Sequence, residues 1–96
     1  MSASSSRSSD LLTASALIAT GKNRINAISL IGDGVNAGTL TVYDNTSAAG
    51  KVIGYVATKT SDVQNHIIFT FPVYAENGIF ASLTGTGAKY IIFYGA

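Results

Sequence analysis

The 96-residue chain contains no cysteine and no tryptophan, and it has one proline and one histidine. Without cysteine it can form neither a disulfide framework nor a cysteine-ligated zinc module. Charged residues make up only 11% of the chain, whereas a soluble domain usually carries ~25%. The few lysines and arginines are dispersed and the net charge is +1, which excludes a basic nucleic-acid binder. No apolar run approaches the ~18 residues of a membrane span, so neither nucleic acid nor a membrane is an expected partner.

Groups that could carry catalysis are equally scarce. His66 has no acid and no nucleophile at a recognisable spacing, so we expect no catalytic site and no cofactor. The glycine-rich stretch 32–38 lacks the lysine of a phosphate-binding loop, and it precedes a strand rather than a helix. Asp33 and Asn36 could offer oxygen atoms to calcium, but the EF-hand spacing is absent. The stretch therefore predicts a hairpin connection without a metal, and the chain is not expected to be an enzyme.

The pattern from residue 11 onward is that of short β-strands between turns. Runs of β-branched and aromatic residues recur at intervals of roughly 8–14 residues, which is typical of an antiparallel sandwich or barrel. No segment has the 3.6-residue periodicity of an amphipathic helix. We predict one all-β domain over residues 11–96, built as a sandwich or a barrel. Its seven expected strands cover residues 11–19, 25–31, 39–43, 52–58, 66–71 (ended by Pro72), 79–84 and 90–94.

Several of these strands are apolar on both faces. Strict alternation places successive side chains of a strand on opposite faces. In residues 52–57 one face then holds Val52 and Val56, and the other holds Ile53, Tyr55 and Ala57. In residues 66–71 one face holds Ile67, Phe69 and Phe71, and the other holds His66, Ile68 and Thr70. In residues 90–94 one face holds Ile91 and Phe93, and the other holds Tyr90, Ile92 and Tyr94. One face of each strand can fill the core, and the other leaves apolar surface that hardly any charge protects. Such surface is typical of an interface. The candidate interface aromatics are Tyr43, Tyr55, Tyr90 and Tyr94.

The first ten residues are rich in serine and have no apolar periodicity, so they cannot bury a hydrophobic face of their own. We predict that residues 1–10 form an extended arm that lies on a neighbouring subunit. The residues assigned to this tether are Ser2, Ser4, Ser5, Ser6, Arg7, Ser8, Ser9 and Asp10.

Two segments carry a resemblance to a known group of proteins. Residues 38–53 (GTLTVYDNTSAAGKVI) and 77–94 (NGIFASLTGTGAKYIIFY) join Asn-Gly or Thr-Gly turns to β-branched and aromatic strands. In this they resemble the small β-sandwich virion proteins of tailed bacteriophages, and the resemblance implies a jelly-roll or immunoglobulin-like sandwich. The resemblance implies a structural protein that decorates or cements a capsid, on the capsid exterior rather than the tail. Its expected partners are the major capsid protein or other virion subunits, and further copies of itself, with a trimer as the expected oligomer.

An alternative is a tail or fibre part, or a lectin-like module that binds a receptor. In that case polar turn residues would line a glycan site, and the candidates are Asp33, Asn36, Asp44 and Asn45. A lectin-like module should expose aromatic residues in its loops, whereas nearly all aromatic residues of this chain fall within expected strands. The structural role is therefore the preferred hypothesis.

Overall fold

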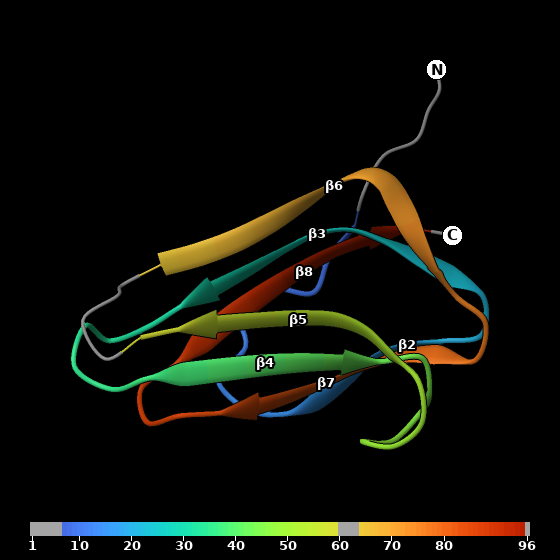
Figure 1. Cartoon of the computed structure of the whole chain (residues 1–96). Coiled ribbons are helices and arrows are strands. Elements are labelled where there is room, and N and C mark those ends of the chain that lie inside the picture. The colour runs from blue at the N-terminus through green and yellow to red at the C-terminus, as the bar shows by residue number, and fades with distance from the viewer. Residues whose placement is uncertain (1–6, 60–63, 96) are drawn as a thin grey trace.

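Eight β-strands make up the regular structure of the chain (Figure 1). The computed structural model describes residues 7–59 and 64–95, with the backbone alone for residues 64–72, and no helix occurs within these ranges. The strands are β1 (Arg7–Ser8), β2 (Ala16–Thr20), β3 (Asn23–Ile31), β4 (Gly38–Tyr43), β5 (Val52–Thr58), β6 (Gln64–Ala75), β7 (Gly78–Thr84) and β8 (Lys89–Gly95). The all-β prediction is confirmed.

The strands form two four-stranded antiparallel sheets, ordered β1-β8-β3-β6 and β2-β7-β4-β5, which pack as a sandwich. The first strand pairs with the last, the second with the seventh, the third with the sixth and the fourth with the fifth. The chain is thus one long antiparallel hairpin whose two arms are rolled together into two sheets. This strand order is that of a jelly roll, so the structure selects the jelly-roll alternative over the immunoglobulin-like one.

Most connections pass from one sheet to the other. Only β4 and β5 are consecutive in sequence and paired in the same sheet. Residues 32–37 join β3 to β4 across the sandwich, so the predicted hairpin connection at this stretch is wrong. The turn at residues 85–87 crosses in the same way, and Gly85 and Gly87 have the positive φ angles expected of it, 115° and 75°. A Cβ atom on Gly85 would lie 2.5 Å from the Ala37 carbonyl oxygen, so the two crossovers pack directly together.

The predicted strand over residues 11–19 is divided between the two sheets. Residues 7–12 follow β8, because Ser9 N donates to Ile92 O and Leu12 exchanges both backbone hydrogen bonds with Tyr90. The chain then crosses to the other sheet, where β2 pairs with β7. The apolar pattern of residues 11–19 is interrupted by Thr13 and Ser15, which mark the crossing rather than the middle of a strand.

Strand β6 is longer than predicted and continues through Pro72. Among the described strands it pairs with β3 alone, and the register of this pair is irregular. The β6 segment from Ile68 to Val73 is three residues longer than the β3 segment from Ile25 to Ala27 that it faces. Proline lacks the backbone N–H of a central ladder, but an edge strand with an irregular register accommodates it. The prediction that Pro72 ends the strand is therefore wrong. The faces predicted for residues 66–71 lie outside the side chains that the structure describes.

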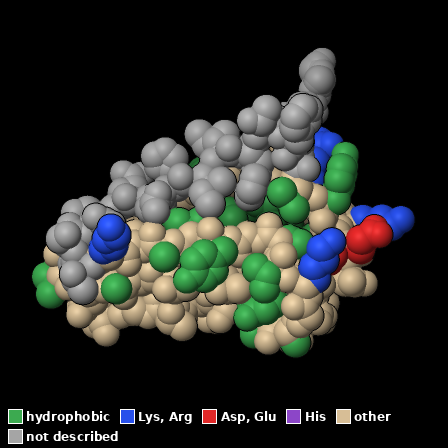
Figure 2. All heavy atoms as spheres, in the orientation of Figure 1, with side chains coloured by type: hydrophobic (Ala, Val, Ile, Leu, Met, Phe, Trp, Pro, Cys, Tyr) green, Lys and Arg blue, Asp and Glu red, His purple; other side chains and the backbone are tan. Residues whose placement is uncertain are grey.

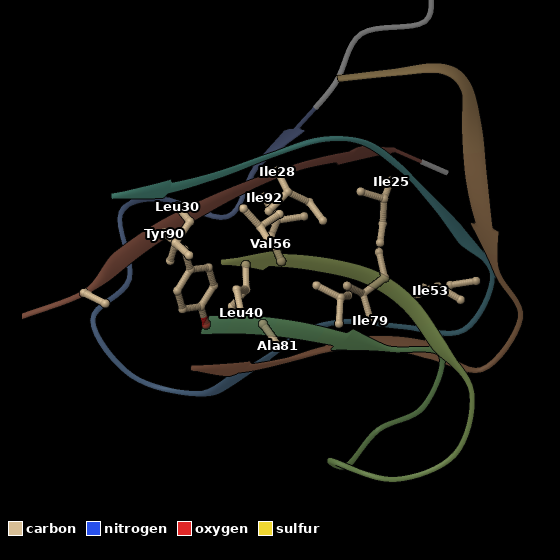
Figure 3. Packing of buried hydrophobic residues seen from close by; sticks show 13 residues of the cluster. Ile25, Ile28, Leu30, Leu40, Ile53, Val56, Ile79, Ala81, Tyr90 and Ile92 are labelled. Atoms are coloured by element: carbon tan, nitrogen blue, oxygen red, sulfur yellow. The ribbon is translucent and has the colours of Figure 1, made fainter. Parts of the chain in front are cut away.

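The core lies between the inner faces of the two sheets (Figure 3). Ile28 and Leu30 of β3 and Ile92 of β8 meet Leu40 of β4 and Val56 of β5, and all five are buried. The sheets approach each other closely at Gly54, where an added Cβ atom would lie 2.8 Å from Ile28 Cδ1. A glycine in β5 leaves room for the isoleucine of the opposite sheet. Each fully buried Leu or Ile contributes roughly 1.5–3 kcal/mol by removal from water.

Candidate functional site

The two sheets differ in their charge. None of the residues in β2, β4, β5 and β7 is charged, and these strands will be called the charge-free sheet. Three basic residues, Arg7, Arg24 and Lys89, lie in the strands of the other sheet, which will be called the basic sheet. The described carboxylates all lie in connections between strands. Since charged side chains normally cover the outer face of an exposed antiparallel sheet, the charge-free sheet is the unusual surface of this molecule.

An apolar row crosses the whole outer face of this sheet. Leu17 of β2 faces Phe80 of β7, Phe80 faces Tyr43 of β4, and Tyr43 faces Val52 of β5. Side chains that are directly opposite in an antiparallel pair lie on the same face, about 4.5–5.5 Å apart at Cβ. The two ends of the row are the most open, with Leu17 44% and Val52 49% exposed. This set of four side chains will be called the apolar row.

The rest of the outer face is polar but uncharged. Thr41 of β4 lies between Ser82 of β7 and Tyr55 of β5, and the Tyr55 side chain is 57% exposed. Thr39 lies between Thr84 and Ala57 one step further along. Figure 2 shows separate hydrophobic side chains among uncharged surface on the visible side of the molecule, with Lys and Arg toward its margins. The face can therefore offer apolar contact and hydroxyl hydrogen bonds without the cost of desolvating a charge.

An irregularity in β5 creates one end of the apolar row. Tyr43 pairs with Val52, but the preceding residue of β4, Val42, pairs with Gly54, so Ile53 is an extra residue. The extra residue allows Ile53 to be buried while Val52 and Tyr55 both face outward. Strict alternation had grouped Val52 with Val56 and Ile53 with Tyr55, and this prediction is wrong because a bulge changes the phase of the strand.

The four candidate tyrosines occupy different environments. Tyr43 and Tyr55 lie on the outer face of the charge-free sheet, as described above. Tyr94 packs against the core from β8. Tyr90 is fully buried, its hydroxyl donates to the Ala14 carbonyl oxygen at 2.8 Å, and burial raises the pKa of its phenol. Tyr90 is thus a core residue and cannot form part of a surface of the folded chain.

Three residues of the apolar row, Leu17, Phe80 and Val52, were not among the candidate interface residues. Each is apolar and lies in a predicted strand. The sequence does not reveal the register between the strands, and it is this register that places the three residues in one row with Tyr43. The remaining exposed large hydrophobic side chains of the described residues, Leu11, Val35 and Tyr74, lie outside this sheet.

The described part of the predicted arm lies on its own chain. Arg7 and Ser8 pair with Tyr94 and Phe93 of β8, and Ser9 Oγ accepts from Ile92 N at 2.9 Å. Asp10 has a positive φ angle of 73° and lies between the β1 pairing and the pair of Leu12 with Tyr90. Residues 7–10 are therefore an edge segment of the basic sheet. The other candidates in the arm, Ser2, Ser4, Ser5 and Ser6, lie outside the described residues.

The polar turn residues proposed for a glycan site are divided between the two ends of the sandwich. Asp33 and Asn36 precede β4, whereas Asp44 and Asn45 follow it. A strand of this length separates the two pairs by about 20 Å. The four residues consequently cannot line a single site.

Both aspartates accept hydrogen bonds from backbone N–H groups, Asp33 within its own loop and Asp44 from the connection between β6 and β7. Asp44 Oδ1 accepts from Asn77 N at 2.8 Å and from Glu76 N at 2.9 Å, and these bonds hold the pKa of its carboxyl below the usual value, with Lys51 adding to the effect. Asp33 accepts from the backbone N–H groups of Val35 and Asn36, and the pKa of its carboxyl is lowered for the same reason. The bonding at Asp33 is Asx-type, which is the ordinary structural use of aspartate in turns, whereas Asp44 joins two separate connections.

The described residues contain no group of three or more histidine, cysteine or acidic side chains that could hold a metal ion. The side chain of His66, the single histidine, lies outside the described part. No helix long and apolar enough to cross a membrane occurs in the described ranges. The surface that remains as a candidate site is the outer face of the charge-free sheet. Comparisons of the chain with protein families, with curated proteins and with solved structures gave no match.

Proposed function

We propose that this chain is a structural virion protein that binds capsid subunits through the outer face of its charge-free sheet. The observation that carries the proposal is the apolar row, which crosses four strands that contain no charged residue. Uncharged strand surface of this kind invites association with other chains unless a partner covers it. A chain that is part of an assembly keeps such a surface because the assembly covers it.

The energetics favour many weak contacts over one tight contact. Covering the exposed parts of Leu17, Val52 and Tyr55 removes a modest apolar area from water, at roughly 25 cal/mol per Å². A particle that holds many copies multiplies such contacts through avidity, which suits a protein that decorates or cements a capsid.

The topology is compatible with this assignment. Jelly rolls with two four-stranded sheets recur in viral capsid proteins and in lectins, so the fold alone does not choose between these functions. The separation of Asp33 and Asn36 from Asp44 and Asn45 disfavours one glycan site formed by all four residues. The uncharged outer face remains as the feature that favours a structural subunit.

The test combines particle composition with two variants. Quantitative mass spectrometry of purified particles of the encoding virus should find the chain in many copies. The double variant Leu17→Lys, Val52→Lys places a charge at each end of the apolar row, and we expect it to be lost from the particles. Thr86→Lys, in the exposed turn between β7 and β8, adds the same charge outside the sheet and should remain bound. Absence from particles, or glycan binding by the isolated protein that survives the double variant, would contradict the proposal.

A further inference from the structure

Residues 7–12 form one edge of the basic sheet, where they follow β8. Their side chains are exposed or partly exposed, and Leu12 alone among them packs against the hydrophobic core. A segment that buries little apolar surface opens at a low free energy compared with the rest of a structure. Residues 7–9 can therefore leave β8 while Leu12 keeps its place beside Tyr90.

A β-bulge interrupts this edge between Ser9 and Leu12. The chain supplies two residues there, Asp10 and Leu11, where β8 supplies only Ile91. Asp10 has a φ angle of 73°, and no other residue of the described ranges except glycine has a positive φ angle. Glycine is the usual residue at the left-handed position of a bulge, because a Cβ atom is disfavoured there. The bent conformation of Asp10 is therefore a local cost that a straight chain would not carry.

Local hydrogen bonds hold the bend at Asp10. Its backbone N–H donates to Ser8 Oγ at 3.0 Å, and its Oδ1 accepts from Leu11 N at 2.8 Å. The bend also leaves the Leu11 side chain 46% exposed. Covering this leucine would remove apolar surface from water, so contact with another chain at the bend is favourable.

We infer that residues 7–9 exchange between two copies of this chain, with Asp10 as the hinge. Each segment leaves its own β8 and pairs with β8 of the other copy, and Asp10 becomes extended. The same hydrogen bonds form in the new place, including those that join Ser9 with Ile92, so the exchange loses none of them. The gain is the release of the bend and the coverage of Leu11. Exchange of an identical element is a low-cost route to a dimer.

The length of the hinge limits which copies can exchange. The three Cα–Cα steps from Ser9 to Leu12 span at most about 11 Å when the chain is extended. The β8 edges of the two copies must therefore lie side by side about a two-fold axis. The exchange involves the basic sheet and a second copy of the chain, so it goes beyond the proposed attachment to a capsid through the charge-free sheet. The double variant Leu17→Lys, Val52→Lys should abolish that attachment and leave the exchange unchanged.

Engineered cysteines distinguish exchange from pairing within one chain, because the chain has none of its own. Ser8 faces Phe93, and residues directly opposite in an antiparallel pair have Cα atoms about 4.5–5.5 Å apart, within the range of a disulfide. Equal amounts of Ser8→Cys and Phe93→Cys, prepared as separate single variants, are unfolded in urea, refolded together and oxidised. We expect a disulfide-linked heterodimer in severalfold higher yield than from Ser8→Cys mixed with Thr86→Cys, a change in the exposed turn before β8.

Two substitutions of the hinge provide a matched pair. Asp10→Gly tolerates the positive φ angle and should raise the dissociation constant of the dimer about tenfold, which equals ~1.4 kcal/mol. Asp10→Pro holds φ near about −65°, which excludes the bend, and should lower that constant about tenfold. Sedimentation velocity over a range of protein concentrations measures both. The inference would be overturned by a heterodimer yield no higher than in the Thr86→Cys control, by equal dissociation constants in the two hinge variants, or by a parent chain or Asp10→Pro variant that stays monomeric.

Discussion

The two sheets of this sandwich have the same number of strands and the same antiparallel pairing, yet they differ in what they present to the outside. The basic sheet carries Arg7, Arg24 and Lys89 in its strands. The strands of the charge-free sheet contain no charged residue. Both bury apolar side chains inward. The inner faces therefore account for the fold, and the difference between the outer faces is not required by it.

Hydrogen bonds at two places connect the sheets to each other near their ends. Asp44, which follows β4 of the charge-free sheet, accepts from Glu76 N and Asn77 N in the connection from β6 to β7. Tyr90 of the basic sheet donates to Ala14 O, in the segment that crosses toward β2. Each contact fixes a place where the chain passes from one sheet to the other.

The largest expected effect separates the two faces of one strand. Leu40→Ala removes a fully buried side chain from the inner face of β4, and we expect a loss of about 2–5 kcal/mol in the free energy of unfolding. Thr41→Ala changes the next residue, on the outer face, and should alter that free energy by less than about 0.5 kcal/mol. Urea denaturation followed by circular dichroism measures both. Comparable losses in the two variants would show that the outer face also contributes to folding.

A smaller loss of stability is expected when the hydrogen bonds accepted by Asp44 are removed. Asp44→Ala deprives two backbone N–H groups of their acceptor, which should lower the free energy of unfolding by about 1–3 kcal/mol. Asp44→Asn keeps a side-chain oxygen at the same place and should retain part of this stability. Denaturation of the three proteins at neutral pH gives the order of their stabilities. An alanine variant as stable as the parent would contradict the stabilising role of these hydrogen bonds.

The same carboxylate predicts how stability depends on acid. The backbone bonds hold the pKa of Asp44 below its usual value, so the unfolded chain takes up this proton more readily than the folded chain. The stabilisation is complete above the unfolded-state pKa, near 4, and is lost as the pH falls from there through the lower folded-state pKa. Unfolding midpoints measured from pH 6 to pH 2 should decline less steeply in Asp44→Asn than in the parent protein.

The smallest expected effect on stability concerns the hydrogen bond from Tyr90 to Ala14. Tyr90→Phe removes the hydroxyl that donates to Ala14 O but keeps the buried ring, so we expect a loss of about 1 kcal/mol. Burial raises the pKa of this phenol, and the parent protein should therefore lose stability as the pH rises above about 10, the value of a tyrosine in an unfolded chain. Alkaline denaturation that is identical in parent and variant would contradict this account.

Much of the fold was predictable from local patterns. The strands at residues 25–31, 39–43, 52–58, 79–84 and 90–94 are found close to their expected positions, because β-branched and aromatic runs between glycine-rich turns leave few other local structures. The errors lie where tertiary pairing overrides a local signal. Pro72 is tolerated because β6 is an edge strand, and the bulge at Ile53 changes which side chains of β5 face outward.

The candidate site was predicted only in part. The shortage of charge and the abundance of tyrosine indicated an interface, and Tyr43 and Tyr55 lie on the charge-free face. Tyr90 has the same residue type and strand context, but it points into the core. Sequence alternation shows that two faces exist without showing which of them is covered.

The sequence by itself determined the class of the fold, the near absence of charge and the positions of most strands, because these depend on residue type and on neighbours along the chain. The tertiary structure alone decided the jelly-roll order, the crossing of residues 7–20 from one sheet to the other, and the alignment of Leu17, Phe80, Tyr43 and Val52 in one row. These features depend on strand register between segments far apart in the chain, and a shift of one residue would turn every side chain of a strand to the opposite face.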